Sequence, residues 1–165
     1  MAIRMTEEQF EQKYLQYSQD LFNVAYGYTR NVQDAEDIVQ NVFIKFIQYD
    51  YNFKTDNDEK YWLIRVTINE SINFVKSSYK KKTVYSDEIV NSTSDQTKEN
   101  TSKEILQFYV EKLPEKYKVV VILFYYENLK TIEISKLLDI SEAAVRKRLE
   151  RAREILKKKM EAYNG

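Results

Sequence analysis

Glycine and proline are almost absent from this chain of 165 residues, which has two glycines, one of them the last residue, and a single proline. These two residue types interrupt helices more than any others, and so long helices are expected. The length suits one domain or two small ones. Apolar residues recur at helical spacing from the start, as in the series Phe10, Tyr14, Tyr17, Leu21, Val24 and Tyr28. The sequence therefore predicts an all-α fold.

Residues 131–160 have the pattern of two helices joined by a tight turn. Ser141 is a good N-cap, and Glu142 places negative charge at the positive end of the second helix. Asp139 tolerates the left-handed conformation that the turn requires. The residues expected to hold the first helix and the turn in place are Ile132, Ile134, Leu137, Leu138 and Ile140. They face the stripe Val145, Leu149, Ala152, Leu156 and Met160. This pattern predicts a helix-turn-helix.

The other face of the second helix is basic. It carries Arg146, Lys147, Arg148, Arg151, Arg153, Lys157, Lys158 and Lys159 against Glu150 and Glu154. In a docked helix-turn-helix the start of the second helix enters the major groove, where arginine can bond guanine O6 and N7. The outward residues at that end, Arg146, Lys147, Glu150 and Arg151, are therefore candidates for base contacts. A plain solvated face is the alternative explanation.

The sequence has neither cysteine nor histidine. This removes disulfides, zinc sites of the Cys/His kind, cysteine nucleophiles and histidine bases. The acidic residues form no recognisable metal-ligand cluster, and there is no glycine-rich phosphate loop. The longest apolar run, residues 119–126, is too short to span a bilayer. We therefore expect a cytoplasmic protein that does not insert into the membrane, is not itself an enzyme and holds no metal or cofactor.

Two helices are expected before residue 50. Thr6 and Gln9 fit a capping box at the start of the first. Asn31 can cap the second, and acidic residues crowd the turn that follows: Asp34, Glu36 and Asp37. They suit the helix dipole, but beside an exposed Gln40 they can equally form a docking surface for a basic partner.

A third helix is expected from about residue 57 to residue 79, with Asp56 and Glu59 as a second capping-box pair. Its core face is expected to be Trp62, Leu63, Val66, Ile72 and Val75. Asn69 and Asn73 lie among these at helical spacing, so each is exposed, buried with a partner, or in contact with a ligand. Four lysines near the end of the helix suit either its dipole or a phosphate backbone: Lys76, Lys80, Lys81 and Lys82.

Residues 83–103 are rich in Ser, Thr, Asn and Asp and have few apolar residues. This composition predicts a flexible linker between two small helical domains, residues 1–82 and 104–165. In the second domain Pro114 is well placed to start a helix. The run 117–126 has the β-branched and aromatic residues of a buried strand, but it has no second strand to pair with, and we predict a helix.

Nearly all of residues 10–160 resembles a bacterial sigma factor of the sigma-70 superfamily, in the two-domain extracytoplasmic-function group. The resemblance rests on the order and spacing of four segments: DAEDIVQNVFIKF at 34–46, YWLIRVTINESINFVK at 61–76, LPEKYKVVVILFYYENL at 113–129 and IEISKLLDISEAAVRKRLERAR at 132–153. It implies that residues 1–82 bind core RNA polymerase and the −10 element, and that residues 104–165 bind the −35 element. It also implies an anti-sigma factor as a partner.

The resemblance assigns roles by position. Polymerase docking falls to Asp34, Glu36, Asp37, Ile38 and Gln40. Phe53 and Asn69 match positions that hold a flipped-out −10 base by stacking and by edge hydrogen bonds. The lysines Lys76, Lys80, Lys81 and Lys82 lie where the −10 backbone is expected. The −35 duplex falls to Arg146, Lys147, Glu150 and Arg151, with Lys130 and Thr131 at its backbone.

A stand-alone helix-turn-helix regulator that binds duplex operator DNA is the alternative, because such regulators have a similar C-terminal domain. Phe53, Asn69 and the acidic turn at 34–37 favour the sigma factor, since a plain regulator has no reason to carry them. A scaffold or inhibitor-binding protein is a third hypothesis, and it predicts no dependence of function on the basic helix face.

Overall fold

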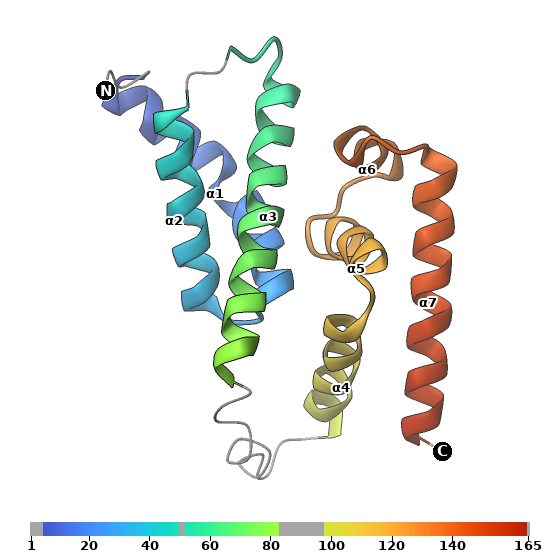
Figure 1. Ribbon diagram of the computed structural model, residues 1–165. Coiled ribbons are helices and arrows are strands. Elements are labelled where there is room, and N and C mark those ends of the chain that lie inside the picture. The colour runs from blue at the N-terminus through green and yellow to red at the C-terminus, as the bar shows by residue number, and fades with distance from the viewer. Residues whose placement is uncertain (1–4, 50–51, 83–97, 165) are drawn as a thin grey trace. The chain divides into compact units, whose positions relative to one another are not determined.

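The computed structural model describes residues 5–49, 52–82 and 98–164, and it divides into two compact units, Met1–Ser77 and Ser78–Gly165. Every regular element in the described residues is a helix, so the prediction of an all-α protein with two helical domains is confirmed (Figure 1). Most of the predicted linker, 83–103, lies outside the described residues, but its last part is helical from Lys98. None of the described helices combines the length and the apolar character needed to cross a membrane.

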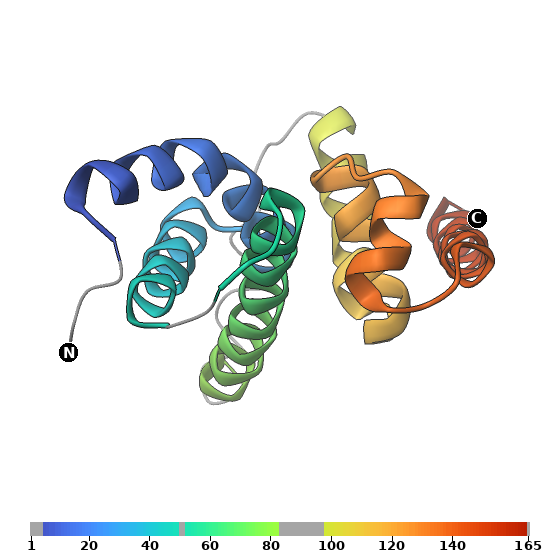
Figure 2. The same cartoon turned by 90° about the horizontal axis from the view of Figure 1, so that it is seen from above.

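The first unit is built from α1 (Glu7–Thr29), α2 (Val32–Gln48) and α3 (Asp56–Lys82). Successive helices run in opposite directions (Figure 1), and α1 lies along one side of the α2 and α3 pair (Figure 2). Both predicted caps are confirmed. Thr6 and Gln9 exchange the two hydrogen bonds of a capping box, at 3.0 and 3.2 Å, and Asn31 Oδ1 accepts from the backbone N–H of Asp34 at 2.9 Å.

The core of this unit is formed by apolar faces of all three helices. α1 supplies Tyr17, Leu21, Val24, Ala25 and Tyr28; α2 supplies Ala35, Ile38, Val39, Val42, Phe43 and Phe46; and α3 supplies Leu63, Ile64 and Ile68. Phe43 is the meeting point of the aromatic residues, with its ring centroid 5.0 Å from that of Tyr14 and 5.9 Å from that of Phe10. Burial of these large rings supplies much of the driving force for folding.

The start of α3 differs from the predicted capping box. Thr55 is the cap, because its Oγ1 accepts from the backbone N–H of Asp58 at 3.1 Å, and the helix begins at Asp56. Glu59 is buried, at 8% exposure, and accepts hydrogen bonds from Lys13 Nζ at 2.7 Å and from the Tyr17 hydroxyl at 2.8 Å. Burial, together with the hydrogen bond and charge of Glu59, raises the pKa of Tyr17 well above its usual range. The carboxylate thus joins α1 to α3.

The buried face of α3 is also rotated from the predicted one. Leu63 is buried as expected, but Trp62, Val66, Ile72 and Val75 are half-buried, while Ile64, Thr67, Ile68 and Ser71 are buried. Thr67 can be buried because its Oγ1 donates to the carbonyl of Leu63 at 2.7 Å, which satisfies the hydroxyl within the helix.

The second unit contains α4 (Lys98–Lys112), α5 (Glu115–Val121), the π-helical turn η1 (Ile122–Tyr126), α6 (Thr131–Leu138) and α7 (Glu142–Asn164). α7 packs against α4, α5 and α6 (Figure 1). α4 begins at Lys98, six residues before the predicted start of the second domain at residue 104. Pro114 precedes α5 as predicted, and the helical prediction for 117–126 is confirmed. The π-helical turn was not predicted; its N–H of Glu127 donates to the carbonyl of Ile122 at 3.1 Å.

The predicted helix-turn-helix is confirmed. Ser141 Oγ accepts from the backbone N–H of Ala144 at 3.0 Å, and Asp139 has the expected left-handed conformation, with φ 56°. The core beneath it gathers Val119, Val120, Val121, Ile122, Leu123, Leu129, Ile134, Leu137, Val145, Leu149 and Ala152. Ile132 departs from the prediction: its side chain is 44% exposed, because it lies on the outer side of the short α6.

Candidate nucleic-acid interface

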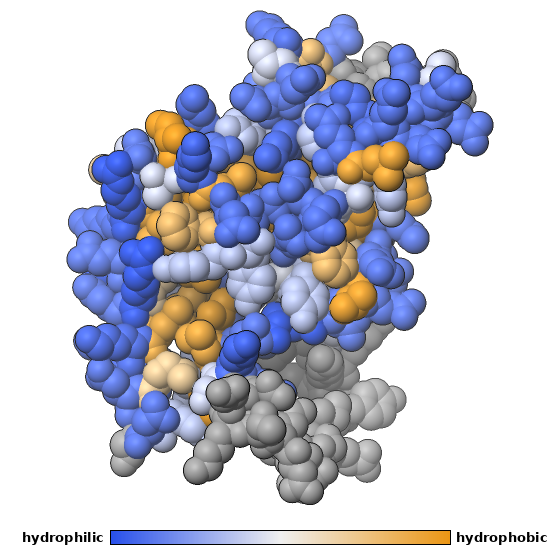
Figure 3. All heavy atoms as spheres, turned by 180° about the vertical axis from the view of Figure 1, so that it is seen from behind, coloured by the Kyte–Doolittle hydropathy of each residue, from blue (hydrophilic) through white to orange (hydrophobic). Residues whose placement is uncertain are grey.

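The outer face of α7 is built by simple helical geometry. Val145, Leu149 and Ala152 are buried, so the residues between them point outward. All four predicted base-contacting residues, Arg146, Lys147, Glu150 and Arg151, are exposed. Seen from behind, hydrophilic side chains follow the outer edge of α7 beside a band of apolar ones (Figure 3). The face is therefore open to a duplex over its first turns.

Glu142, at the first position of α7, holds two of the predicted −35 residues. Its Oε1 accepts from Thr131 Oγ1 at 2.9 Å and from Arg146 Nη2 at 2.6 Å. The carboxylate therefore joins the start of α6 to the start of α7 and orients the arginine. Sequence analysis did not include Glu142 in the site, although its i,i+4 spacing from Arg146 was available as a sign.

Lys130, the remaining predicted −35 residue, is exposed at the N-cap position of α6. Its backbone N–H donates to Glu133 Oε1 at 3.1 Å, a bond that caps the start of α6. On α7, Arg151 pairs loosely with Glu154 at 3.7 Å. Such exposed pairs contribute little, about 0.3–0.5 kcal/mol, and do not prevent a phosphate contact.

Two residues of the predicted basic face have other roles. Arg153 Nε donates to the Tyr125 hydroxyl at 2.8 Å, and the guanidinium lies 5.8 and 5.7 Å from the ring centroids of Phe124 and Tyr125. Arg153 therefore fastens α7 to η1 by hydrogen bonding and cation–π attraction. Arg148 is half-buried. The basic face is consequently narrower than the sequence predicts.

A second candidate face runs along α3. Trp62, Asn69 and Lys76 are seven residues apart, and seven residues are almost two full turns, so the three lie on one side of the helix about 10 Å apart. Asn69 and Lys76 are exposed. Phe53, in the segment before α3, is half-buried and lies 5.9 Å from Trp62 and 6.4 Å from Phe46, ring centroid to centroid. An aromatic group, an amide and an ammonium thus follow one another along α3.

The lysines at the end of α3 are described only in part. The helix continues through Lys80, Lys81 and Lys82, but the positions of these three side chains lie outside the described residues. Asn73, one turn beyond Asn69, is exposed as well. Both asparagines lie on this side of the helix, and Asn69 is the nearer of the two to the line from Trp62 to Lys76.

The predicted polymerase-docking residues lie on α2. Glu36, Asp37 and Gln40 are exposed, and Asp34 is half-buried. Of the three acids only Asp34 lies in the first turn, so the helix dipole accounts less well for the other two. A groove of about 370 Å³ between α1 and α2 is lined by Glu36 and Gln40 from one side and by Tyr14, Ser18, Gln19 and Phe22 from the other.

Ile38 does not share this surface. Its side chain is 2% exposed and packs in the core of the first unit, because α2 turns the positions of Ala35, Ile38 and Val42 inward. In the described structure the Ile38 side chain is closed off from a partner, and its docking role stays a prediction. In the described residues no group of three or more Asp or Glu side chains is arranged to hold a metal ion.

Comparison with known proteins matches both helical units of the chain to one family. The family model described as Sigma-70 region 2 matches residues 14–81, and that described as Sigma-70, region 4 matches residues 103–156. SigW of Bacillus subtilis (strain 168), an ECF RNA polymerase sigma factor, is 30% identical over 161 residues, which cover 87% of this chain and 84% of SigW. The chain belongs to the ECF sigma factors of the sigma-70 family.

A second relative is similar in sequence, and two solved structures share the fold. SigV of the same organism is 28% identical over 141 residues, covering 86% of this chain and 84% of SigV. CnrH, solved with the cytosolic domain of CnrY, shares the fold with a TM-score of 0.64 and 18% identity over 95% of this chain and 90% of CnrH. RpoE of Bartonella quintana, solved with the anti-sigma factor NepR, also shares the fold, with a TM-score of 0.60. It is 16% identical and covers 93% of this chain and 98% of RpoE.

The protein is thus an RNA polymerase sigma factor. The match of residues 14–81 to region 2 answers the alternative of a stand-alone regulator, because that alternative shares only the C-terminal domain.

Proposed function

We propose that this sigma factor directs core RNA polymerase to promoters by holding the −35 duplex on α7 and unpaired −10 bases on α3. The observation that carries the proposal is the alignment of Trp62, Asn69 and Lys76 along one side of α3, with Phe53 beside Trp62. Aromatic rings stack on bases, amides bond base edges, and lysines neutralise phosphates. Residues 1–82 take the −10 and polymerase roles and residues 104–165 the −35 role, with 83–103 as the connection.

At the −35 element, Arg146 contacts a guanine edge in the major groove, oriented by Glu142. Lys147, Glu150 and Arg151 lie around it on the same exposed face. Glu150 can accept from the amino group of a cytosine. Lys130 and Thr131 contact the backbone where α6 begins. Thr131 donates its hydroxyl proton to Glu142, so it can donate to a backbone phosphate only if that bond is broken.

At the −10 element, the base flipped out of the stack lies against Phe53 and is bonded by Asn69. Lys76 and the lysines Lys80, Lys81 and Lys82 follow the strand backbone. Neither unit needs high affinity for DNA alone, because tethering through one chain and one polymerase raises the effective concentration at the second element.

The polymerase carries out RNA synthesis, and this chain contributes promoter selection without catalysis of its own, in the cytoplasm where the polymerase and the promoter are. Glu36, Asp37 and Gln40 form the docking surface for the polymerase, with Asp34 at its edge. An anti-sigma factor is a further partner. The two structures of similar fold support it, since RpoE was solved with the anti-sigma factor NepR and CnrH with the cytosolic domain of CnrY.

Gel filtration with bacterial core polymerase free of other sigma factors tests the docking surface. The wild-type chain is expected to co-elute, and the triple change Asp34→Asn, Glu36→Gln, Asp37→Asn is expected to abolish co-elution. Neutralising the exposed acids Glu7, Glu8 and Glu11 of α1 is the matched control and should leave it intact. Equal loss of co-elution in both variants would mean that net charge alone accounts for the effect. Unchanged co-elution of the first variant would mean that these α2 acids are not part of the docking surface.

A further inference from the structure

One carboxylate oxygen in the second unit accepts hydrogen bonds from two helices. Glu142 Oε1 accepts from the Thr131 hydroxyl at 2.9 Å and from Arg146 Nη2 at 2.6 Å. Thr131 is the first residue of α6, Glu142 is the first residue of α7, and Arg146 lies one turn farther along α7. A chain of hydrogen bonds therefore runs from α6 to the arginine that is proposed to contact a base.

The ion pair between Glu142 and Arg146 does not by itself fix the arginine. The Arg146 side chain is 67% exposed, and i,i+4 ion pairs on an exposed helix face are weak. Arg151 and Glu154 show the usual case, since they lie 3.7 Å apart and both are more than half exposed. Another contact is needed to hold the Glu142 carboxylate in one place.

Thr131 supplies that contact from a separate helix. α6 packs against α7, and Ile134 and Leu137 of α6 are buried with Val145 of α7 in the core of the unit. The start of α6 therefore has a fixed position beside the first turn of α7. Threonine is branched at Cβ and has few rotamers, and Thr131 is half-buried, so the direction of its hydroxyl is restricted. The hydroxyl can thus fix the carboxylate, and the carboxylate can fix the guanidinium.

The available donors allow this chain to persist when DNA binds. A guanidinium has five N–H donors; Arg146 uses one on Glu142, and a bidentate contact to guanine O6 and N7 needs two more. The Thr131 hydroxyl has a single proton, which Glu142 already accepts. The backbone N–H of Thr131, at the first position of α6, has no acceptor within its own helix and can meet a phosphate instead. The hydroxyl therefore need not leave Glu142.

We propose that Thr131 is a positioning residue for base recognition at the −35 element: its hydroxyl holds Glu142, and Glu142 holds Arg146 in the orientation that meets guanine. This inference rests on the proposed function and deepens it, because it transfers the contribution of the Thr131 side chain from the DNA backbone to a base. Removal of the hydroxyl then weakens binding only where Arg146 and its guanine are both present. A hydroxyl that bonds a phosphate would contribute whatever the base.

The test uses the full-length chain bound to core polymerase and a −35 duplex from a promoter that the wild-type holoenzyme enriches from random DNA. Each guanine is replaced in turn by 7-deazaguanine, which lacks the N7 acceptor. The guanine of Arg146 is the one whose replacement weakens wild-type binding and leaves Arg146→Ala unaffected. Thr131→Val, which removes the hydroxyl and keeps the branched shape, should bind the intact duplex roughly fivefold more weakly. Most of this effect should disappear on the 7-deazaguanine duplex, and less than about twofold should remain in the Arg146→Ala background.

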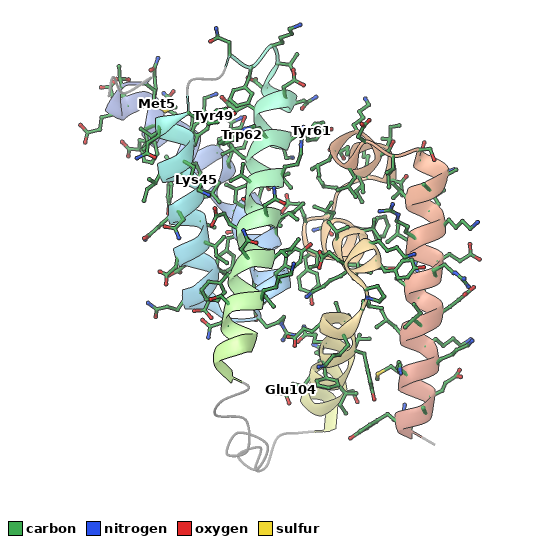
Figure 4. The ribbon with its side chains drawn as sticks, viewed as in Figure 1. Met5, Lys45, Tyr49, Tyr61, Trp62 and Glu104 are labelled. Carbon is green, nitrogen blue, oxygen red and sulfur yellow. The ribbon has the colours of Figure 1, made fainter. Side chains whose placement is uncertain are left out.

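Three further variants check the chain of contacts. Thr131→Ser restores the hydroxyl and should recover most of the lost affinity. In the background of Glu142→Ala, Thr131→Val should have no added effect. Because Glu142→Ala also deletes a negative charge, Glu104→Ala is the matched control. Glu104 is exposed on α4, at the far end of the unit from α6 (Figure 4), and its loss should leave the effect of Thr131→Val unchanged.

Two results would overturn the inference and leave the proposed function intact. One is an equal effect of Thr131→Val with and without Arg146, which would assign the hydroxyl to the DNA backbone. The other is wild-type binding by Thr131→Val. A chain that forms no holoenzyme would overturn the proposed function, and a holoenzyme without a guanine of this kind would overturn the proposed base contact; the inference falls with either.

Discussion

The two proposed DNA-binding faces of this sigma factor differ in how closely their charges are spaced. α7 presents Arg146, Lys147, Glu150 and Arg151 within six positions, whereas the exposed cations described on the Trp62 side of α3 are Arg65 and Lys76, eleven positions apart. A duplex shows its phosphates outward and rewards positive charge, while an unpaired strand offers the flat surfaces of its bases. The difference teaches that clustered charge alone locates only one of the two proposed faces, although the whole chain has zero net charge.

The faces are also supported differently. α3 is joined to α1 by the buried carboxylate of Glu59, which accepts from Lys13 and Tyr17. α7 is joined to η1 by Arg153 at the surface, through Tyr125 and Phe124. Removal of one partner from a buried charge costs more stability than removal of a surface contact, because the groups that remain are buried and unsatisfied.

The largest effect is expected at the buried support. Glu59→Ala should lower the free energy of unfolding by about 2–3 kcal/mol, because a charge-assisted pair of hydrogen bonds is lost and the Tyr17 hydroxyl is left buried. Urea unfolding followed by circular dichroism measures it. Glu133→Ala is a milder comparison, because this half-exposed carboxylate accepts from the backbone N–H of Lys130 at the surface. A loss below about 0.5 kcal/mol for Glu59→Ala would mean that the supports do not differ.

The next effect concerns recognition by the charged face. Arg146→Ala should weaken binding of the −35 duplex by roughly 1–3 kcal/mol, through loss of a bidentate contact to guanine. Fluorescence anisotropy with holoenzyme and labelled duplex measures it. Lys158→Ala, also exposed but twelve residues farther along α7, should have no more than a small effect. If transcription from a cognate promoter is unchanged in Arg146→Ala, the assignment of this residue to a base is wrong.

A substitution on the α3 face should have its effect in a different assay. Asn69→Ala is expected to reduce promoter opening about tenfold, the value of one lost stacking or base-edge contact, while −35 duplex binding stays near wild type. Permanganate reactivity of unpaired thymines reports the opening. Asn73→Ala, one turn along the same helix and also exposed, is the matched control. Normal melting by Asn69→Ala would remove this residue from the site.

The smallest effect is expected at the surface support. Arg153→Ala should lower the free energy of unfolding by about 0.5–1 kcal/mol, the usual size of an exposed cation–π contact. Thermal unfolding measures it, with Tyr125→Phe as a companion that removes only the hydroxyl acceptor. A loss equal to that of Glu59→Ala would contradict the distinction drawn between the two supports.

Local features were predictable from sequence. The caps at Thr6, Asn31 and Ser141, the left-handed Asp139 and the helix-turn-helix each depend on residues within a few positions, and all are confirmed. The start of α3 was not, because Glu59 looks like a capping residue until Lys13 and Tyr17, more than forty positions earlier, are brought beside it. Likewise, two adjacent apolar stripes on α3 gave no local reason to prefer Ile64 over Val66.

The candidate site was predictable in its exposed residues and not in its contacts. Arg146, Lys147, Glu150, Arg151 and Asn69 are exposed as a contact role requires. Ile38 was placed with its exposed neighbours because a short acidic segment does not show which side of the helix faces the core. The two bonds of Glu142 and the diversion of Arg153 to Tyr125 depend on distances between elements, which no spacing along the chain contains.

The π-helical turn η1 affects how the length of this chain can vary. Its hydrogen bond from Glu127 to Ile122 spans five residues, one more than in an α-helix, so loss of one residue here can be absorbed by a return to α-helical bonding. The same deletion inside α7 would rotate every later side chain by about 100° and exchange its buried and exposed faces. Among descendants of a common ancestor, single-residue insertions and deletions in the second unit are therefore expected to survive at η1 and to be eliminated from α7.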